Sequence, residues 1–151
     1  ADQINQHGTN FGCARLISNE CEISLSAALV QVARTSRGSH SVILWIMKNK
    51  PSEIKGKIPV AQLGLFDDSS SLPAMKLRVE WSMGSESAPF IPKDKSVEET
   101  SLIFKACQTG SFTSGEERLC LDGRKSRACR TENLPFSMNG GTQVLSLIEQ
   151  K

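Results

Sequence analysis

Hydrophobic and polar residues alternate without a break over the nine positions from residue 75 to residue 83. A repeat of two residues places every apolar side chain on one face of a strand and every polar side chain on the other. The alternation therefore predicts a strand that is buried on one face. No other segment of the chain indicates its structure so directly.

Two further segments are rich in aliphatic residues. Residues 42–47 are six consecutive apolar residues, which is typical of a short central strand buried on both faces. Residues 23–33 alternate with a change of phase near Val30, as a bulge or a change of burial would produce. Because residues 34–40 between them are polar, we expect strands 23–33 and 41–48 to pair as an antiparallel hairpin.

Weaker strand signals lie elsewhere in the chain. Residues 57–66 contain Pro59 and Gly64, so an edge strand or an irregular strand fits this segment better than a central one. Residues 143–149 follow the turn-forming residues 139–141 and are expected to form the last strand.

One helix is also predicted. Ser96 and Glu99 match a capping box, and Gly110 provides a stop signal, so a helix is expected over residues 97–108. Alternation within residues 102–106 leaves a strand as the competing interpretation.

These elements predict a mainly β fold with one short helix, arranged as a β-sandwich or barrel-like sheet, with an α+β fold as the alternative. The chain has 151 residues, of which 38% are hydrophobic, as in ordinary globular proteins. We therefore expect one β-rich domain over residues 1–151. Residues 1–12 are polar and contain two glycines, which indicates a loose N-terminal segment.

The formal net charge of +2 is too small to hold the protein on nucleic acid or an anionic membrane without local clustering. No apolar run is long enough to predict a transmembrane helix. The sequence starts at Ala1 without a methionine or an apolar leader. This start suits a mature exported protein whose signal has been removed, and equally a trimmed fragment.

Five cysteines bear most directly on the class of protein. A hairpin across residues 18–20 would place Cys13 opposite Cys21, within the separation that a disulfide requires. A second disulfide would then join two of the remaining three, Cys107, Cys120 and Cys129, leaving one thiol over. This pairing indicates a secreted or periplasmic protein, whereas in a cytosolic protein the same residues would be small buried hydrophobic side chains.

Catalytic signals are weak. His7 and His40 lie in expected loops, where a solvent-exposed imidazole is the simplest interpretation. No Cys-x-x-Cys pair, phosphate-binding loop or nucleophile elbow occurs, and tyrosine is absent. We therefore expect no enzyme activity, no metal and no cofactor. The alternative is a small enzyme assembled from His40, Asp67 and Asp68.

The remaining feature is a basic segment over residues 118–130, in which one acid, Asp122, accompanies five cations. The cations are Arg118, Arg124, Lys125, Arg127 and Arg130. Such a cluster fits phosphate, a sulfated glycan or an acidic protein, and the alternative is a loop that only promotes solubility. The segment contains no aromatic residue, so base stacking is not predicted.

The order of cysteines and apolar motifs resembles the invasion-associated locus B family of exported bacterial proteins. The motifs are Cys13 and Cys21, an expected strand pair, Leu63-Gly64-Leu65-Phe66, Leu77-Arg78-Val79 and Cys107. The chain departs from the family pattern in lacking a tryptophan before the first cysteine and in having Cys129 in addition. The resemblance implies a small disulfide-bearing β-sandwich without catalysis, with an envelope or host-interaction role.

The sequence as a whole predicts an exported or surface-associated binding protein without catalytic activity. Its partner would be a protein or an anionic polymer, bound by the basic segment. The alternatives are a viral or phage coat or matrix protein whose basic loop contacts nucleic acid, and the small enzyme described above.

Overall fold

The computed structural model describes residues 8–49 and 75–151, which form three helices and five strands. The helices are α2 (Phe11–Cys21), α3 (Leu25–Thr35) and α5 (Leu102–Thr109). The strands are β1 (Ser39–Lys48), β2 (Lys76–Gly84), β3 (Thr113–Leu119), β4 (Arg127–Met138) and β5 (Gly141–Gln150).

The five strands form one antiparallel sheet in the order β2-β1-β5-β4-β3. The position of β1 beside the centre confirms the prediction for residues 42–47, because the consecutive side chains of Val42 and Ile43 are both fully buried. Strands are also confirmed for residues 75–83, now β2, and for residues 143–149, now β5. The expectation that all apolar side chains of 75–83 share one face is wrong, because a register shift opposite Leu44 and Trp45 places Trp81 on the α2 and α3 side while Leu77 and Val79 face α5. Residues 57–66 lie outside the described part of the chain.

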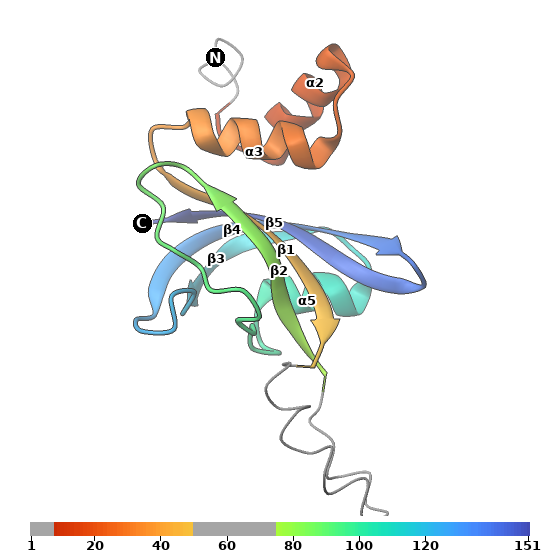
Figure 1. The fold of residues 1–151 in the computed structure, drawn as a ribbon, viewed down its shortest axis with the longest axis vertical. Coiled ribbons are helices and arrows are strands. Elements are labelled where there is room, and N and C mark those ends of the chain that lie inside the picture. Colours follow the sequence, from red (N-terminus) through yellow and green to blue (C-terminus); the bar gives the residue numbers. More distant parts are fainter. Residues whose placement is uncertain (1–7, 50–74) are drawn as a thin grey trace, which may run out of the picture.

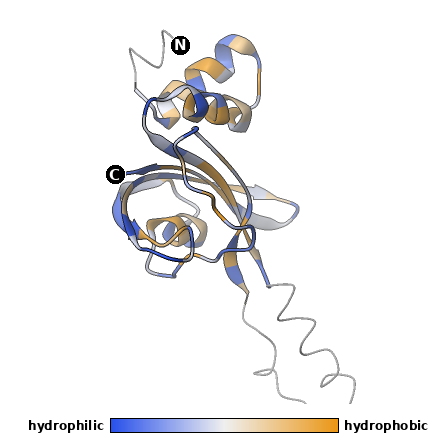
Figure 2. Cartoon of the chain, turned by 60° about the vertical axis from the view of Figure 1, so that its left-hand side comes forward, coloured by the Kyte–Doolittle hydropathy of each residue, from blue (hydrophilic) through white to orange (hydrophobic). Residues whose placement is uncertain are grey.

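The sheet is covered by helices on both faces (Figure 1). α2 and α3 lie over one face, and α5 lies within the curve of the other (Figure 2). The core under α2 and α3 contains Phe11, Cys13, Ala14, Ala28, Leu29, Val32, Ala33, Val42, Leu145 and Leu147. The core around α5 contains Ile43, Trp45, Leu77, Val79, Ile91, Ile103, Ala106, Leu119, Leu121, Cys129, Val144 and Ile148.

The hairpin expected around residues 18–20 and the strand expected over residues 23–33 are wrong, because these segments form α2 and α3. Both helices have side-chain caps, since Asn10 accepts a hydrogen bond from Cys13 N and Ser24 accepts one from Ala27 N. The alternation of residues 23–29 misled the prediction because Leu25, Leu29 and Val32 also follow helical spacing. The N-terminal segment described as loose ends earlier than expected, since α2 starts at Phe11.

The described chain is therefore mainly β with some helix. The sandwich or barrel is not confirmed, because the described strands form a single sheet that does not close on itself. The helical content of α2 and α3 arises where strands were expected, so the fold has more helix than the sequence pattern indicated.

The predicted helix at residues 97–108 exists, but it starts later, at Leu102. Ser101 rather than Ser96 is its N-cap, and Ser96 instead forms a β-bridge with Arg78. Backbone hydrogen bonds of Val79 with residues 94 and 95, and of Leu77 with residue 97, hold that segment along the outer edge of β2. This pairing removes Ser96 from the helix and covers part of an edge strand.

A buried chain of polar side chains crosses the sheet on the α5 side. Trp45 Nε1 donates to Ser146 Oγ at 3.0 Å, and Ser146 Oγ donates to Asn133 Oδ1 at 2.7 Å. Asn133 Nδ2 donates to Thr113 Oγ1 at 3.2 Å, and Thr113 donates in turn to the carbonyl of Leu102 in α5. This row of hydrogen-bonded side chains links strands β1, β5, β4 and β3 to helix α5. Asn133 and Ser146 have no exposed surface.

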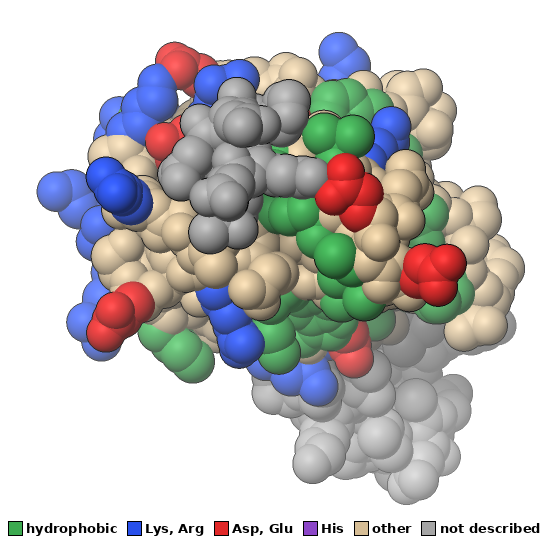
Figure 3. All heavy atoms as spheres, turned by 90° about the horizontal axis from the view of Figure 1, so that it is seen from above, with side chains coloured by type: hydrophobic (Ala, Val, Ile, Leu, Met, Phe, Trp, Pro, Cys, Tyr) green, Lys and Arg blue, Asp and Glu red, His purple; other side chains and the backbone are tan. Residues whose placement is uncertain are grey.

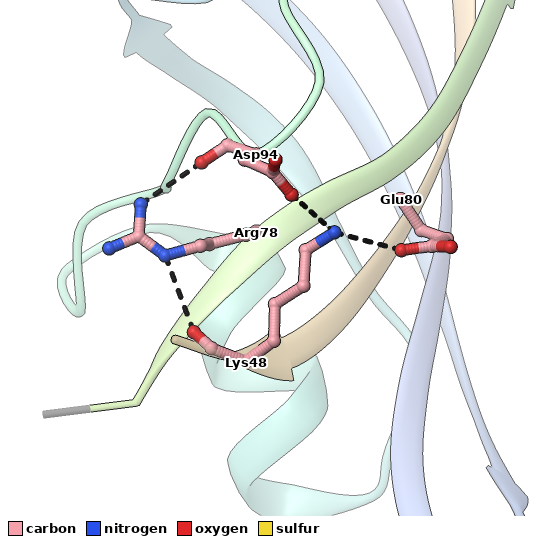
Figure 4. Close-up of polar contacts among 4 residues, drawn as sticks. All are labelled: Lys48, Arg78, Glu80 and Asp94. Atoms are coloured by element: carbon pink, nitrogen blue, oxygen red, sulfur yellow. Dashed lines mark hydrogen bonds and ion pairs between the residues drawn. The ribbon is translucent and has the colours of Figure 1, made fainter. Parts of the chain in front are cut away.

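A cluster of charges fixes the loop that follows β2. Lys48 Nζ donates to Glu80 Oε2 at 2.8 Å and forms an ion pair with Asp94 (Figure 4). The buried guanidinium of Arg78 donates to the carbonyl of Asp94 at 3.0 Å and to that of Lys48 at 3.3 Å. The end of β1, the middle of β2 and the far end of the loop are thereby held together.

Candidate functional site

All five cysteines are free thiols, so the predicted disulfides are wrong. Cys13 and Cys21 lie eight residues apart on α2, which corresponds to about 12 Å along a helix, well beyond disulfide distance. Burial raises the pKa of the Cys13, Cys107 and Cys129 thiols. These three side chains therefore act as protonated, weakly reactive groups of the interior.

The basic segment is organised around Asp122 in the loop between β3 and β4. Asp122 Oδ1 accepts hydrogen bonds from the backbone N–H of Arg124 at 2.8 Å and of Lys125 at 3.0 Å. The bonds from Lys125 and Arg124 lower the pKa of Asp122, so its carboxylate stays ionised. This turn leaves the side chains of Arg124 and Lys125 exposed.

Two further cations brace the same loop. Arg118 Nη2 donates to the carbonyl of Ser126 at 3.1 Å, and Arg127 forms an ion pair of 3.8 Å with Asp122. Figure 3 looks onto the α2 and α3 side of the molecule and shows lysine and arginine side chains mainly along the left of the view. The structure thus brings four of the five predicted cations together.

Sequence reasoning missed an exposed aromatic residue whose neighbour in sequence lies against this loop. Phe90, between β2 and α5, is 80% exposed, the highest value among the large hydrophobic side chains that the structure describes. Its neighbour Pro89 lines a shallow hollow together with Asp122, Lys125 and Arg127. The signal was present in the sequence as a phenylalanine close to two prolines, at positions 89 and 92, where no regular pairing is expected.

The fifth cation, Arg130, lines a separate polar pocket of about 230 Å³ on the α2 side of the sheet. His40 of β1, Glu132 of β4 and Glu149 of β5 line the same pocket, and residues 8–10 lie at its rim. His40 is in a strand and only 5% exposed, so the expectation of an exposed loop imidazole is wrong. His7, Asp67 and Asp68 lie outside the described residues.

Ser36 fixes the state of the His40 ring. Its Oγ lies 2.8 Å from His40 Nδ1 and also 2.8 Å from the carbonyl oxygen of Ala33. The single hydroxyl proton goes to the carbonyl, which can only accept, so Ser36 accepts from His40 Nδ1–H. The other ring nitrogen, Nε2, is then an acceptor in this tautomer.

Glu132 joins the pocket to α2. Its Oε2 accepts a hydrogen bond of 3.3 Å from the backbone N–H of Phe11, the first residue of that helix. Burial raises the pKa of Glu132, although this bond and the charge of Arg130 act in the opposite direction. The ionised Glu132 carboxylate anchors the start of α2, but its partial burial costs stability because the charge loses contact with water.

A scan against models of known protein families matches none, and a search of curated proteins finds no similar sequence. Within residues 8–49 and 75–151, no three histidine, cysteine or acidic side chains are placed to hold a metal ion. None of the described helices combines the length and apolarity needed to cross a membrane.

Proposed function

We propose that the protein is a non-catalytic binding protein that recognises an acidic segment of a partner protein. The contact is made by Phe90, Arg118, Arg124, Lys125 and Arg127, called here the loop surface. The observation that carries this proposal is the 80% exposed Phe90, whose neighbour Pro89 lines one hollow with Asp122, Lys125 and Arg127 of the cationic loop. Aromatic and arginine side chains are the residues most enriched where protein partners meet.

The charges of the loop surface favour an acidic partner. Asp122 is held by its own backbone turn and by Arg127, so it offsets little of the charge of Arg124 and Lys125. Exposed cations of this kind speed association with an acidic partner and select against a basic one. Phe90 adds an apolar anchor that a purely electrostatic surface lacks.

Both parts of the loop surface are held in place before a partner binds. The charge cluster of Lys48, Glu80 and Asp94 fixes the loop that carries Phe90. The turn at Asp122 fixes the loop between β3 and β4. Preorganised loops lose less conformational entropy on binding. The location outside the cytosol is a separate proposal, and the Cys13–Cys21 disulfide that was its main basis is absent.

A selection of peptides from a random library on the full chain tests this function. We expect selected peptides to be rich in aspartate, glutamate and apolar residues, and to bind Phe90→Ala and Arg124→Glu/Lys125→Glu about tenfold more weakly or worse. Met138→Ala and Lys105→Glu change exposed residues away from the loop surface and serve as matched controls.

The competing function, binding of an anionic polymer, predicts a different result. Heparin or duplex DNA would then bind with a steep dependence on salt, and Phe90→Ala would have no effect. That outcome, or selected peptides that bind all variants equally, would overturn the proposal.

A further inference from the structure

The pocket beside α2 gathers charged groups from three adjacent strands. In the sheet register His40 lies opposite Glu149, and Glu149 lies opposite Arg130, so the three residues form one row across β1, β5 and β4. Glu132 is two residues from Arg130 on β4 and therefore projects from the same face. Leu147 contributes an apolar patch to the lining.

These groups do not satisfy one another. Among the described residues, Arg130 forms no ion pair with Glu132 or Glu149, although all three line one pocket. Within residues 8–49 and 75–151, the Glu132 carboxylate accepts a hydrogen bond from Phe11 N alone, and His40 Nε2 has no partner. His40 is buried, and Glu132 and Glu149 are partly withdrawn from water, whereas Arg130 beside them is exposed. Polar groups withdrawn from water without partners cost stability, which points to a ligand that completes them.

The polar groups define the chemistry of that ligand. Two carboxylates and an imidazole nitrogen accept hydrogen bonds, and they suit an ammonium group with its three donors. The guanidinium of Arg130 suits a carboxylate, which it binds with two parallel hydrogen bonds. A volume of about 230 Å³ is below the usual range of about 300–1,000 Å³ for drug-sized ligands.

We propose that this pocket binds a small amino-acid-like zwitterion. The ammonium group lies between Glu132, Glu149 and His40 Nε2, and the carboxylate contacts Arg130. The site is distinct from the loop surface, since none of the four cations of that surface lines the pocket.

Calorimetric titration of the full chain with a panel of amino acids tests the proposal. We expect at least one amino acid to bind with a Kd of about 1 mM or tighter, whereas its methyl ester and its N-acetyl derivative each bind about tenfold more weakly or worse. If no amino acid binds, or if either derivative binds as well as the parent, the proposal is overturned.

Variants locate the binding on the chain. Arg130→Gln and Glu149→Gln each remove one charge and keep a polar side chain. We expect each variant to bind the amino acid about tenfold more weakly or worse. Glu116→Gln is the matched control, because Glu116 lies opposite Arg130 on β3 but does not line the pocket. Equal affinity in all three variants would overturn the assignment. The double variant Arg124→Glu/Lys125→Glu leaves amino-acid binding unchanged, which separates this pocket from the loop surface.

Discussion

Glu117 of β3 caps the helix that Ser101 begins. Ser101 Oγ donates to Glu117 Oε1 at 2.5 Å, and the backbone N–H of Leu102 donates to Glu117 Oε2 at 2.8 Å. The carboxylate therefore satisfies the first turn of α5 from a residue that comes later in the chain. On the opposite face of the sheet, Glu132 makes the corresponding contact with Phe11 at the start of α2.

Replacing Glu117 by alanine should lower the free energy of unfolding by about 1–2 kcal/mol, because the first turn of α5 loses its acceptor. The sequence pattern instead indicated a capping box of Ser96 and Glu99, and Glu99 is exposed in the structure. Glu99→Ala is therefore the matched control, and urea unfolding should find it close to wild type. A larger loss in Glu99→Ala than in Glu117→Ala would contradict the observed cap.

Asn133 is the central member of the buried polar chain, and its loss removes one hydrogen-bond partner from Ser146 and one from Thr113. We expect Asn133→Ala to lower the free energy of unfolding by about 2–4 kcal/mol, through lost hydrogen bonds and a cavity. Ser114→Ala, an exposed change on the edge strand β3, should have little effect.

A double-mutant cycle separates the contribution of the polar chain from that of the cavity. Asn133→Ala and Ser146→Ala remove two groups that bond directly. Their effects on the free energy of unfolding should therefore be non-additive by about 0.5 kcal/mol or more. Additive effects would show that the two side chains do not act as one network.

Glu132 should make stability fall as the pH rises. Its pKa is higher in the folded protein than in the unfolded chain, so the folded state binds the proton more tightly. Stability is then greatest below the unfolded value of about 4.3 and decreases as the pH rises through the folded value. Glu132→Gln keeps an acceptor for Phe11 N–H without the charge. Urea unfolding should find it more stable than wild type at neutral pH, and a less stable variant would contradict this sign.

The Lys48 cluster should act in the opposite direction. Hydrogen bonds from Lys48 lower the pKa of both Glu80 and Asp94 in the folded protein. Their contribution to stability is complete above the unfolded values of about 4 and is lost as the pH falls through the lower folded values. Lys48→Met should therefore be less stable than wild type at neutral pH, with a difference that shrinks in acid. Lys76→Met, at the exposed start of β2, is the control, and an equal loss there would contradict the role of the cluster.

The strands that the sequence predicts correctly are those whose local pattern and final environment agree. Residues 42–47 are apolar throughout and become buried on both faces. Residues 75–83 form β2, but an irregularity in its pairing with β1 places Trp81 on the opposite face from Leu77 and Val79. Residues 23–33 carry a mixed pattern, and there the cap at Ser24 and the packing on the sheet favour helix α3.

The pocket could not be predicted, because His40, Arg130 and Glu149 are distant in sequence and meet only through strand pairing. The basic segment was visible in the sequence, but the separation of Arg130 from its other four cations was not. Strand β4 carries Arg130 away from the loop, while the turn at Asp122 keeps Arg124 and Lys125 exposed. The Cys13–Cys21 disulfide was predicted from a hairpin, and it is absent because the segment forms helix α2 instead.

The affinity of Phe90→Ala for a selected acidic peptide, measured against wild type by calorimetry at moderate salt, tests the binding function most directly. If the loop surface recognises an acidic protein segment, the loss of this one exposed ring should raise the Kd about tenfold or more. A Kd equal to that of wild type would contradict the function proposed for this surface.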